Sequence, residues 1–408
     1  MSRPVGSKNK PKIKGSGVQV LQFEKQIANT PLTRDSSLGW VKWGEKNDYP
    51  LSLLNLYAQS PTHHAAVDFA ITSIVGNGVD FDAMKLNGDE VIPNANSTWD
   101  EVIKSLATDY ILFGSYALEV IMNKDGKTFS FYHIPLDKVR WSEYDEDGNI
   151  PYYWVCNDWT NTAMNIPVEI EALQIANDTK LEKGKPYLYV YRTYSPTMTY
   201  YTQPHYAAGI NAIESECQFI QYDLRHIING FSAAGVLTLN DVETDEERRA
   251  IIKNIESMFQ GSNNANSIAI TFRNNVEASP VEWTPFQQVS NVNQYADADK
   301  RCINRILCAH QIPNAALIGM PDLTNSGFSS EADKLEVSYQ LYNKITGNKN
   351  RMAVVRTLNQ MFKLNGIGTE IVMKPLSFKD FDNDANVQER TGATNIEEND
   401  AEKITEDK

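Results

Sequence analysis

The residues with the clearest metal-binding spacing are Asp145, Asp147 and Asn149, which match the opening of a calcium-binding loop. Such a loop needs a glycine at its sixth position and a glutamate at its twelfth. This chain has Ile150 and Cys156 at those positions. Asp147 is followed by a glycine between two apolar runs, a pattern that is typical of a β-hairpin turn. The spacing therefore predicts a hairpin and no calcium site.

The cysteines and histidines are scattered. None of the four cysteines belongs to a Cys-x-x-Cys pair, and Cys308 with His310 has no second pair to complete a metal site. This usage favours free buried thiols in a reducing compartment. The adjacent His63 and His64 would point about 100° apart on a helix, which favours a surface or helix-start role. For His226 and His310, packing or hydrogen bonding is favoured over catalysis.

Motifs for nucleotide binding or hydrolysis are missing from the sequence. It contains no GxxxxGK[ST] phosphate loop, no HExxH zinc motif and no GxSxG nucleophile motif. Tyr187, Tyr189 and Tyr191 recur at period two and so share one face of a strand, where cross-strand packing is favoured over an aromatic platform for bases. We therefore expect no catalytic residue, no metal and no cofactor.

The two ends of the chain differ from its middle. Residues 1–14 contain five basic residues and no acid, and residues 1–35 are predicted to be a mobile basic arm. Residues 380–408 carry ten acids against three bases, and they are predicted to be a disordered acidic tail. The net charge of -14 argues against tight, static phosphate binding but not against contact with sliding nucleic acid. No secretory leader and no membrane span are expected.

Residues 36–204 are predicted to begin with helices and to continue with strands. Pro61 suits the first turn of a helix that ends at a glycine pair, and Thr98 with Glu101 fits a capping box at the start of another helix. Asp125 and the glycine after it separate two apolar runs, which indicates a hairpin. Residues 114–200 are therefore expected to be rich in strands.

Two long helices are predicted next, over 205–232 and 288–312, because apolar residues recur at alternating steps of three and four. The seam residues are Ile210, Ile213, Ile220, Leu224, Ile227, Val292 and Ile303. A small αβ unit is predicted between the helices, over 233–287. After a polar loop at 313–330, residues 331–379 are predicted to hold a long helix, interrupted near Gly347 and Asn348, and a last strand at 369–378.

Four stretches of the sequence carry a family resemblance. They are GEKNDYPLSLLNLYAQSPTHHAAVDFAITSIVGNGV, LATDYILFGSYALEVIMNKDGK, NRILCAHQIPNAALIG and SGFSSEADKLEVSYQLYNKI. In this order they resemble tailed-bacteriophage portal proteins of the siphophage type, over about residues 43–379. The chain departs from that family's pattern in lacking a helical C-terminal crown.

The resemblance implies an α+β portal-type subunit that assembles as a ring, usually a dodecamer. It implies a wing at 36–204, a first stem helix at 205–232, a clip at 233–287 and a second stem helix at 288–312. A tunnel loop would follow at 313–330, and the long helix with the wing and crown base would occupy 331–379.

The implied function is a non-enzymatic DNA channel at one vertex of a viral head. It would serve genome packaging, retention and ejection, and would dock the large terminase and head–tail adaptors. Further partners would be double-stranded DNA and the major capsid or scaffold protein. The protein would reside in the virion after assembly in the host cytoplasm, without a membrane.

The resemblance also implies site residues. The tunnel-loop residues expected to line the DNA channel are Asn314, Asp322, Thr324, Asn325, Ser326 and Phe328. The residues expected to dock partners on the clip are Arg248, Arg249, Lys253 and Arg273, with ordinary solvation of a charged helix as the alternative. Two other interpretations remain open: a different structural protein of a virion, such as an adaptor or shell component, and an enzyme without a recognisable motif.

Overall fold

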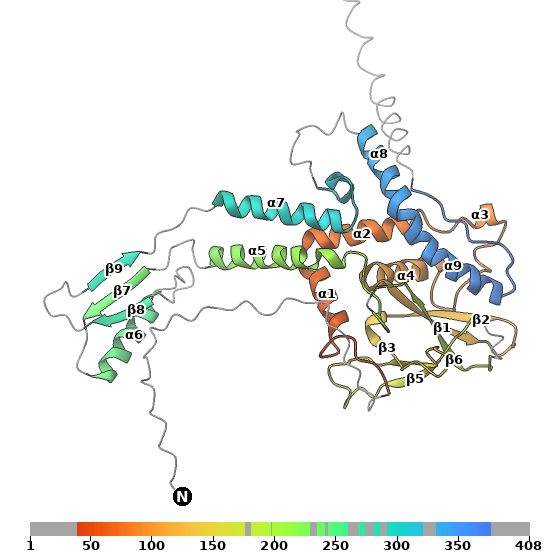
Figure 1. Ribbon diagram of the computed structural model, residues 1–408, viewed down its shortest axis with the longest axis horizontal. Coiled ribbons are helices and arrows are strands. Elements are labelled where there is room, and N and C mark those ends of the chain that lie inside the picture. The colour runs from red at the N-terminus through yellow and green to blue at the C-terminus, as the bar shows by residue number, and fades with distance from the viewer. Residues whose placement is uncertain are drawn as a thin grey trace, which may run out of the picture.

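The computed structural model describes residues 39–175, 181–196, 198–228, 235–240, 244–259, 269–273, 281–285, 292–320 and 332–376. The predicted arm at 1–35 and the predicted tail at 380–408 lie outside these ranges. The described chain is α+β, as expected. Two long helices extend side by side from a body of helices and strands, and a small αβ unit lies beyond their far ends (Figure 1).

Helices form the first part of the body. They are α1 (Tyr49–Gln59), α2 (Pro61–Val75), α3 (Phe81–Met84) and α4 (Trp99–Phe113). Ser60 caps α2 by accepting a hydrogen bond from the backbone N–H of His63 at 3.1 Å. The capping box predicted for Thr98 and Glu101 is present at the start of α4. Local sequence signals therefore set where these helices begin.

A mixed sheet forms the second part of the body. Its strands are β1 (Ser115–Met122), β2 (Phe129–Ile134), β3 (Val139–Trp141), β4 (Tyr152–Val155), β5 (Val168–Ala172) and β6 (Pro186–Arg192), with the short helix η1 (Leu136–Lys138) before β3. The strand order is β2-β1-β6-β5-β4-β3. Only the β5–β6 pair among these is parallel. The expected strand-rich segment is confirmed.

The calcium-like spacing forms a turn between β3 and β4, as predicted. The Asp145 side chain accepts hydrogen bonds from the backbone N–H groups of Asp147 at 3.1 Å and Asn149 at 2.7 Å. Its carboxylate therefore closes its own loop. Within the described residues, no group of three or more histidine, cysteine or acidic side chains is arranged to hold a metal ion.

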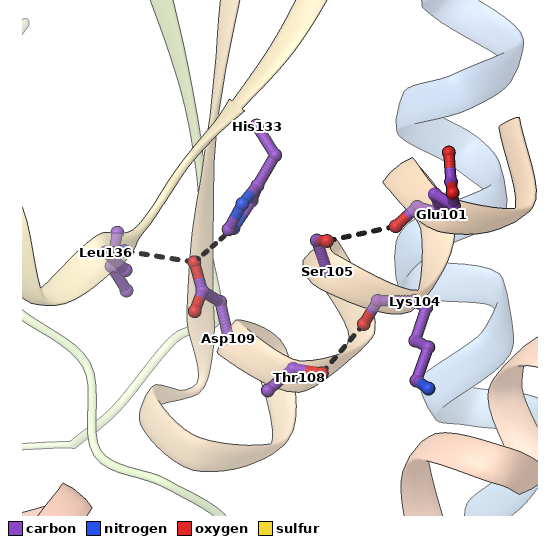
Figure 2. A network of polar contacts seen from close by, with 7 residues as sticks. All are labelled: Glu101, Lys104, Ser105, Thr108, Asp109, His133 and Leu136. Carbon is purple, nitrogen blue, oxygen red and sulfur yellow. Dashed lines mark hydrogen bonds and ion pairs between the residues drawn. The ribbon is translucent and has the colours of Figure 1, made fainter. Parts of the chain in front are cut away.

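A buried polar contact fixes α4 against the sheet (Figure 2). The carboxylate of Asp109 on α4 accepts hydrogen bonds from His133 Nε2 on β2 at 2.7 Å and from the backbone N–H of Leu136 at 3.0 Å. Burial raises the pKa of the Asp109 carboxyl above its ordinary value, although the His133 hydrogen bond opposes this shift. Three elements are therefore held together at one side chain.

The last part of the body is a helical rod made of α8 (Ala332–Tyr342), the π-helical turn η5 (Asn343–Gly347) and α9 (Asn348–Leu364). The predicted interruption near Gly347 is thus present, as a π-helical turn. The Tyr116 hydroxyl of β1 reaches α9, where it donates to the Ala353 carbonyl at 2.9 Å and hydrogen-bonds Thr357 Oγ1 at 2.7 Å. On the other side of η5, at the last residue of α8, the ring centroids of Tyr342 and Phe69 lie 4.8 Å apart.

The prediction of a strand at 369–378 is wrong for 369–376, the part that the structure describes. Residues 369–376 form a single antiparallel bridge, between Met373 and Val79. The backbone of Lys374 lies so close to the end of α2 that a Cβ on Gly76 would approach its carbonyl oxygen to 2.3 Å. The segment therefore docks on a loop, and no adjacent strand extends the pairing.

The extended part of the molecule consists of the two long helices and the αβ unit. The helices are α5 (Ile210–Ile228), which follows the turn η2 (Ala207–Gly209), and α7 (Val292–Ala309), which leads to η3 (Ala315–Ile318). The unit contains β7 (Gly235–Asn240), α6 (Asp245–Phe259), β8 (Ala269–Arg273) and β9 (Val281–Pro285). Its strand order is β8-β7-β9. In the described ranges, no helix is both long and apolar enough to cross a membrane.

Candidate functional site

The inner halves of α5 and α7 pack closely where the helices leave the body. Gly209 allows this approach, because a Cβ at that position would lie 2.5 Å from the Cβ of Ala309. Ile213 and Cys217 on α5 are buried, as are Cys302 and Ile306 on α7. Along two antiparallel helices this spacing places Ile213 opposite Ile306 and Cys217 opposite Cys302. Buried side chains of both helices therefore pack at the base of the pair.

The outer half of α5 is uncovered in a single chain. Ile220 and Leu224, which the seam prediction would bury against the second helix, are 42% and 54% exposed. The same antiparallel register places Ile220 opposite Asp299, a residue that cannot cover an apolar side chain. Ile210 is buried as predicted, and Ile303 packs partly buried against a second apolar cluster. The side chains of Ile227 and Val292 lie outside the described residues.

The root of the 313–330 loop is held by that second cluster. Its buried members are Ala66, Leu307, Ile312 and Tyr342, which come from α2, α7, the segment after α7 and the end of α8. Between the helix and the loop, Gln311 adopts a left-handed backbone with φ of 57° and accepts a hydrogen bond from Thr346 of η5 at 2.5 Å. The loop therefore starts from a fixed point.

The first loop residues are ordered by a local cap. The Asn314 side chain accepts a hydrogen bond from the backbone N–H of Ala316 at 2.9 Å and so begins η3. Gly319 ends η3 in the left-handed region, with φ of 78°. The other predicted loop residues, Asp322, Thr324, Asn325, Ser326 and Phe328, lie outside the described residues. Their role as channel lining stays a prediction.

Two buried histidines, His63 and His310, are in contact just before the start of this loop. His63 Nδ1 lies 2.9 Å from His310 Nε2, and both rings are buried. The ring of Tyr206 stacks on that of His310, with centroids 5.0 Å apart, and its hydroxyl donates to the Leu112 carbonyl at 3.0 Å. Burial lowers the pKa of His63 to about 3 and that of His310 well below its ordinary value. The pair thus joins α2 to the end of α7.

Sequence reasoning missed this pair and its neighbour Glu216. The sequence predicted a surface or helix-start role for His63. His63 does lie in the first turn of a helix, but its ring is buried. The buried Glu216 carboxylate on α5 accepts hydrogen bonds from the hydroxyls of Ser60 and Thr62 at the start of α2. No local signal could reveal contacts between side chains more than 150 residues apart.

The αβ unit places part of the predicted docking set on α6. The guanidinium of Arg248 lies 5.9 Å from the centroid of the Phe272 ring of β8, which ties the helix to the sheet. Arg249 and Lys253 are exposed. Arg273 pairs with Asn240 in the backbone register of β7 and β8, and its side chain lies outside the described residues. Their docking role stays a prediction.

Comparisons with known proteins relate this architecture to a particle neck. A chain in the neck of a native gene transfer agent particle with C12 symmetry matches with a TM-score of 0.54 and 17% identity, over 89% of this chain and 94% of that one. A chain in the neck of the empty particle, computed with C6 symmetry, matches with a TM-score of 0.51 and 16% identity, over 86% of this chain and 91% of that one.

A phage portal protein of the HK97 family from Corynebacterium diphtheriae gives a TM-score of 0.45 and 13% identity, over 79% of this chain and 95% of that chain. That score is too low to establish a shared fold by itself. No protein-family model and no curated protein matches the sequence. The chain therefore shares the fold of a chain from the neck of a gene transfer agent particle.

Proposed function

We propose that this chain is a portal subunit, a non-enzymatic structural protein that forms a ring-shaped DNA channel at one vertex of a head. The observation that carries the proposal is the α5–α7 pair, which projects from the body with an αβ unit at its far end (Figure 1). The fold shared with a particle neck supports it, and the C12 symmetry of that neck favours a dodecamer.

Exposed apolar residues on α5 support assembly of a ring. Ile220 and Leu224 lie one helical turn apart and are both largely exposed in a single copy. Contiguous exposed apolar side chains on a soluble protein mark contact surfaces. A ring places a neighbouring copy beside every stem, and this neighbour would cover what α7 of the same chain leaves open. The pair would then form one segment of a continuous channel wall.

The loop after α7 would guide DNA without binding it tightly. Residues 313–330 contain no lysine and no arginine. Firm phosphate contacts come from basic side chains and make binding strongly salt-dependent, and a ring multiplies each side chain by the number of copies. A polar, almost uncharged loop therefore suits DNA that must pass in both directions, during packaging and during ejection.

The αβ unit would be the docking surface for partners outside the head. Its exposed Arg249 and Lys253 lie on α6, at the end of the stem farthest from the body. The large terminase would bind there during packaging and head–tail adaptors afterwards, while the body would contact the major capsid or scaffold protein. The protein would then reside at the portal vertex of the virion, after assembly in the host cytoplasm.

Electron microscopy of the purified full-length protein tests the proposal. We expect rings with a central hole, and class averages with twelvefold symmetry. Monomers that persist at high protein concentration would contradict the proposal. A second candidate is an adaptor, because the matching chains belong to a neck. An adaptor would join only after DNA is packaged, so presence of this protein in DNA-free precursor heads would exclude it.

A further inference from the structure

The contact between His63 and His310 constrains the protonation state of both rings. Two imidazole nitrogens 2.9 Å apart form a hydrogen bond only when one carries a hydrogen and the other offers a lone pair. The two rings therefore cannot both be protonated while the contact lasts, because both contacting nitrogens would then carry a hydrogen. The two remaining nitrogens, His63 Nε2 and His310 Nδ1, are buried and have no hydrogen-bond partner among the described residues.

The surroundings of the pair offer no compensation for a positive charge. The titratable and charged groups around it are Tyr57 on α1, His64 on α2, His205 and Tyr206 before α5 and Glu216 on α5, with Lys349 on α9 near His205. Glu216 is the acid among them, and its carboxylate is already engaged with Ser60 and Thr62. The histidines and Lys349 would repel an added proton.

The electrostatics act in one direction on both rings. Burial is the main cause of the lowered pKa of His63, and repulsion from His205 adds to it. The same two causes lower the pKa of His310. A histidine released into solvent would instead titrate near its ordinary value of 6.5. Burial and the closed contact therefore oppose protonation of the pair over a pH range in which the separated rings would both bind protons.

The contact lies at a point where its loss would change the geometry of the chain. His310 is the first residue after α7, and Gln311 follows in a left-handed backbone conformation. The hydrogen bond from Thr346 to Gln311 and the apolar packing of Ile312 and η3 also hold the root of the loop to the body. His63, by contrast, lies in the first turn of α2 inside the body.

We propose that the His63–His310 contact is a proton-sensitive latch, which holds the end of α7 and the root of the 313–330 loop to α2 at neutral pH and releases them in acid. This latch does not depend on the chain being a portal subunit, since both partners belong to one chain.

Hydrogen–deuterium exchange of the full-length protein, corrected for intrinsic exchange rates, tests the latch at about pH 7.5 and about pH 5. Protection of peptides covering 303–320 should fall by roughly 30-fold at the lower pH for each histidine that the open state protonates. Peptides from α4 should keep their protection. Unchanged protection of 303–320 in the wild-type protein would overturn the proposal.

Two substitutions separate the latch from a general effect of acid. Asparagine at 63 and glutamine at 310 place an amide where the contacting imidazole nitrogens lie, but neither titrates. The double variant His63→Asn/His310→Gln should therefore lose the pH response, whereas His64→Asn, at the exposed neighbouring histidine, should keep it. A double variant that keeps the full response would also overturn the proposal. If the double variant does not fold, the same exchange measurement on the single variant His63→Asn tests the proposal, and a full pH response of 303–320 would overturn it.

Discussion

Gly209 and Ala309 lie so close across the base of the α5–α7 pair that a Cβ on Gly209 would stand 2.5 Å from the Cβ of Ala309. No larger residue fits there unless the helices move apart. Gly209→Val should therefore destabilise the protein by about 1–3 kcal/mol, the usual cost of overpacking. Chemical denaturation measures the change, with Ala208→Val at the adjacent exposed residue as the control. Equal stabilities of the two variants would show that the helices separate at no cost.

Glu216→Gln tests the link between α5 and the start of α2. The glutamine oxygen can accept from one of the two hydroxyls, those of Ser60 and Thr62, while its NH2 group faces the other, so neither hydrogen bond keeps a charged acceptor. The free energy of unfolding should fall by about 1.5–3 kcal/mol. Glu214→Gln, at a partly exposed position on the same helix, should fall within about 0.5 kcal/mol of the wild type.

Leu224→Glu distinguishes folding from ring assembly. Leu224 is 54% exposed in a single chain, so the stability of the monomer should change by no more than about 0.5 kcal/mol. In a ring the same glutamate would be buried against a neighbour, and sedimentation should show a loss of rings. Gln221→Glu, another exposed residue of α5, provides a control for added charge. Normal rings from Leu224→Glu would remove this face from the subunit contact.

Asn325→Lys/Ser326→Lys tests whether the 313–330 loop lines the DNA channel. A ring would repeat both lysines in every copy, so DNA affinity should rise and the slope of log affinity against log salt should steepen by about 0.9 for each added phosphate contact. Packaging should slow. Asn325→Gln/Ser326→Gln controls for side-chain size without charge. Normal packaging by the lysine variant would indicate that the loop faces a subunit contact.

Arg249→Glu/Lys253→Glu tests docking on α6. Both side chains are exposed, so rings should form normally while affinity for the terminase and the adaptor decreases. Arg248 is better left intact because it packs on the Phe272 ring, and its loss would disturb the unit itself. Glu247→Lys, on the same helix, serves as the control of opposite sign. Unchanged partner binding by the double variant would place the docking surface elsewhere.

The local signals in the sequence were sufficient for much of the fold. The capping box at Thr98, the turn after Asp125 and the periodicity of the long helices each predicted an element that the structure contains. Each of these signals acts within a few residues, where backbone hydrogen bonding and side-chain periodicity decide the outcome.

Contacts between distant segments could not be predicted in this way. Ile213 and Ile220 have the same residue type and the same seam spacing, but one is buried and the other is exposed. The antiparallel spacing of the two helices places Ile306 opposite Ile213 but Asp299 opposite Ile220, and no local pattern reveals that register. The strand predicted at 369–378 failed for a similar reason, because a strand needs a neighbouring edge as well as a suitable sequence.

The π-helical turn between α8 and α9 determines the angular relationship of the two halves of the rod. A π turn holds one residue more than an α turn, and one residue corresponds to about 100° of rotation around the axis. Tyr342 can therefore face Phe69 of α2 while Thr357 faces Tyr116 of the sheet. Deleting one residue of Asn343–Gly347 would restore a regular α-helix, but it would turn one of these two contacts away from its partner.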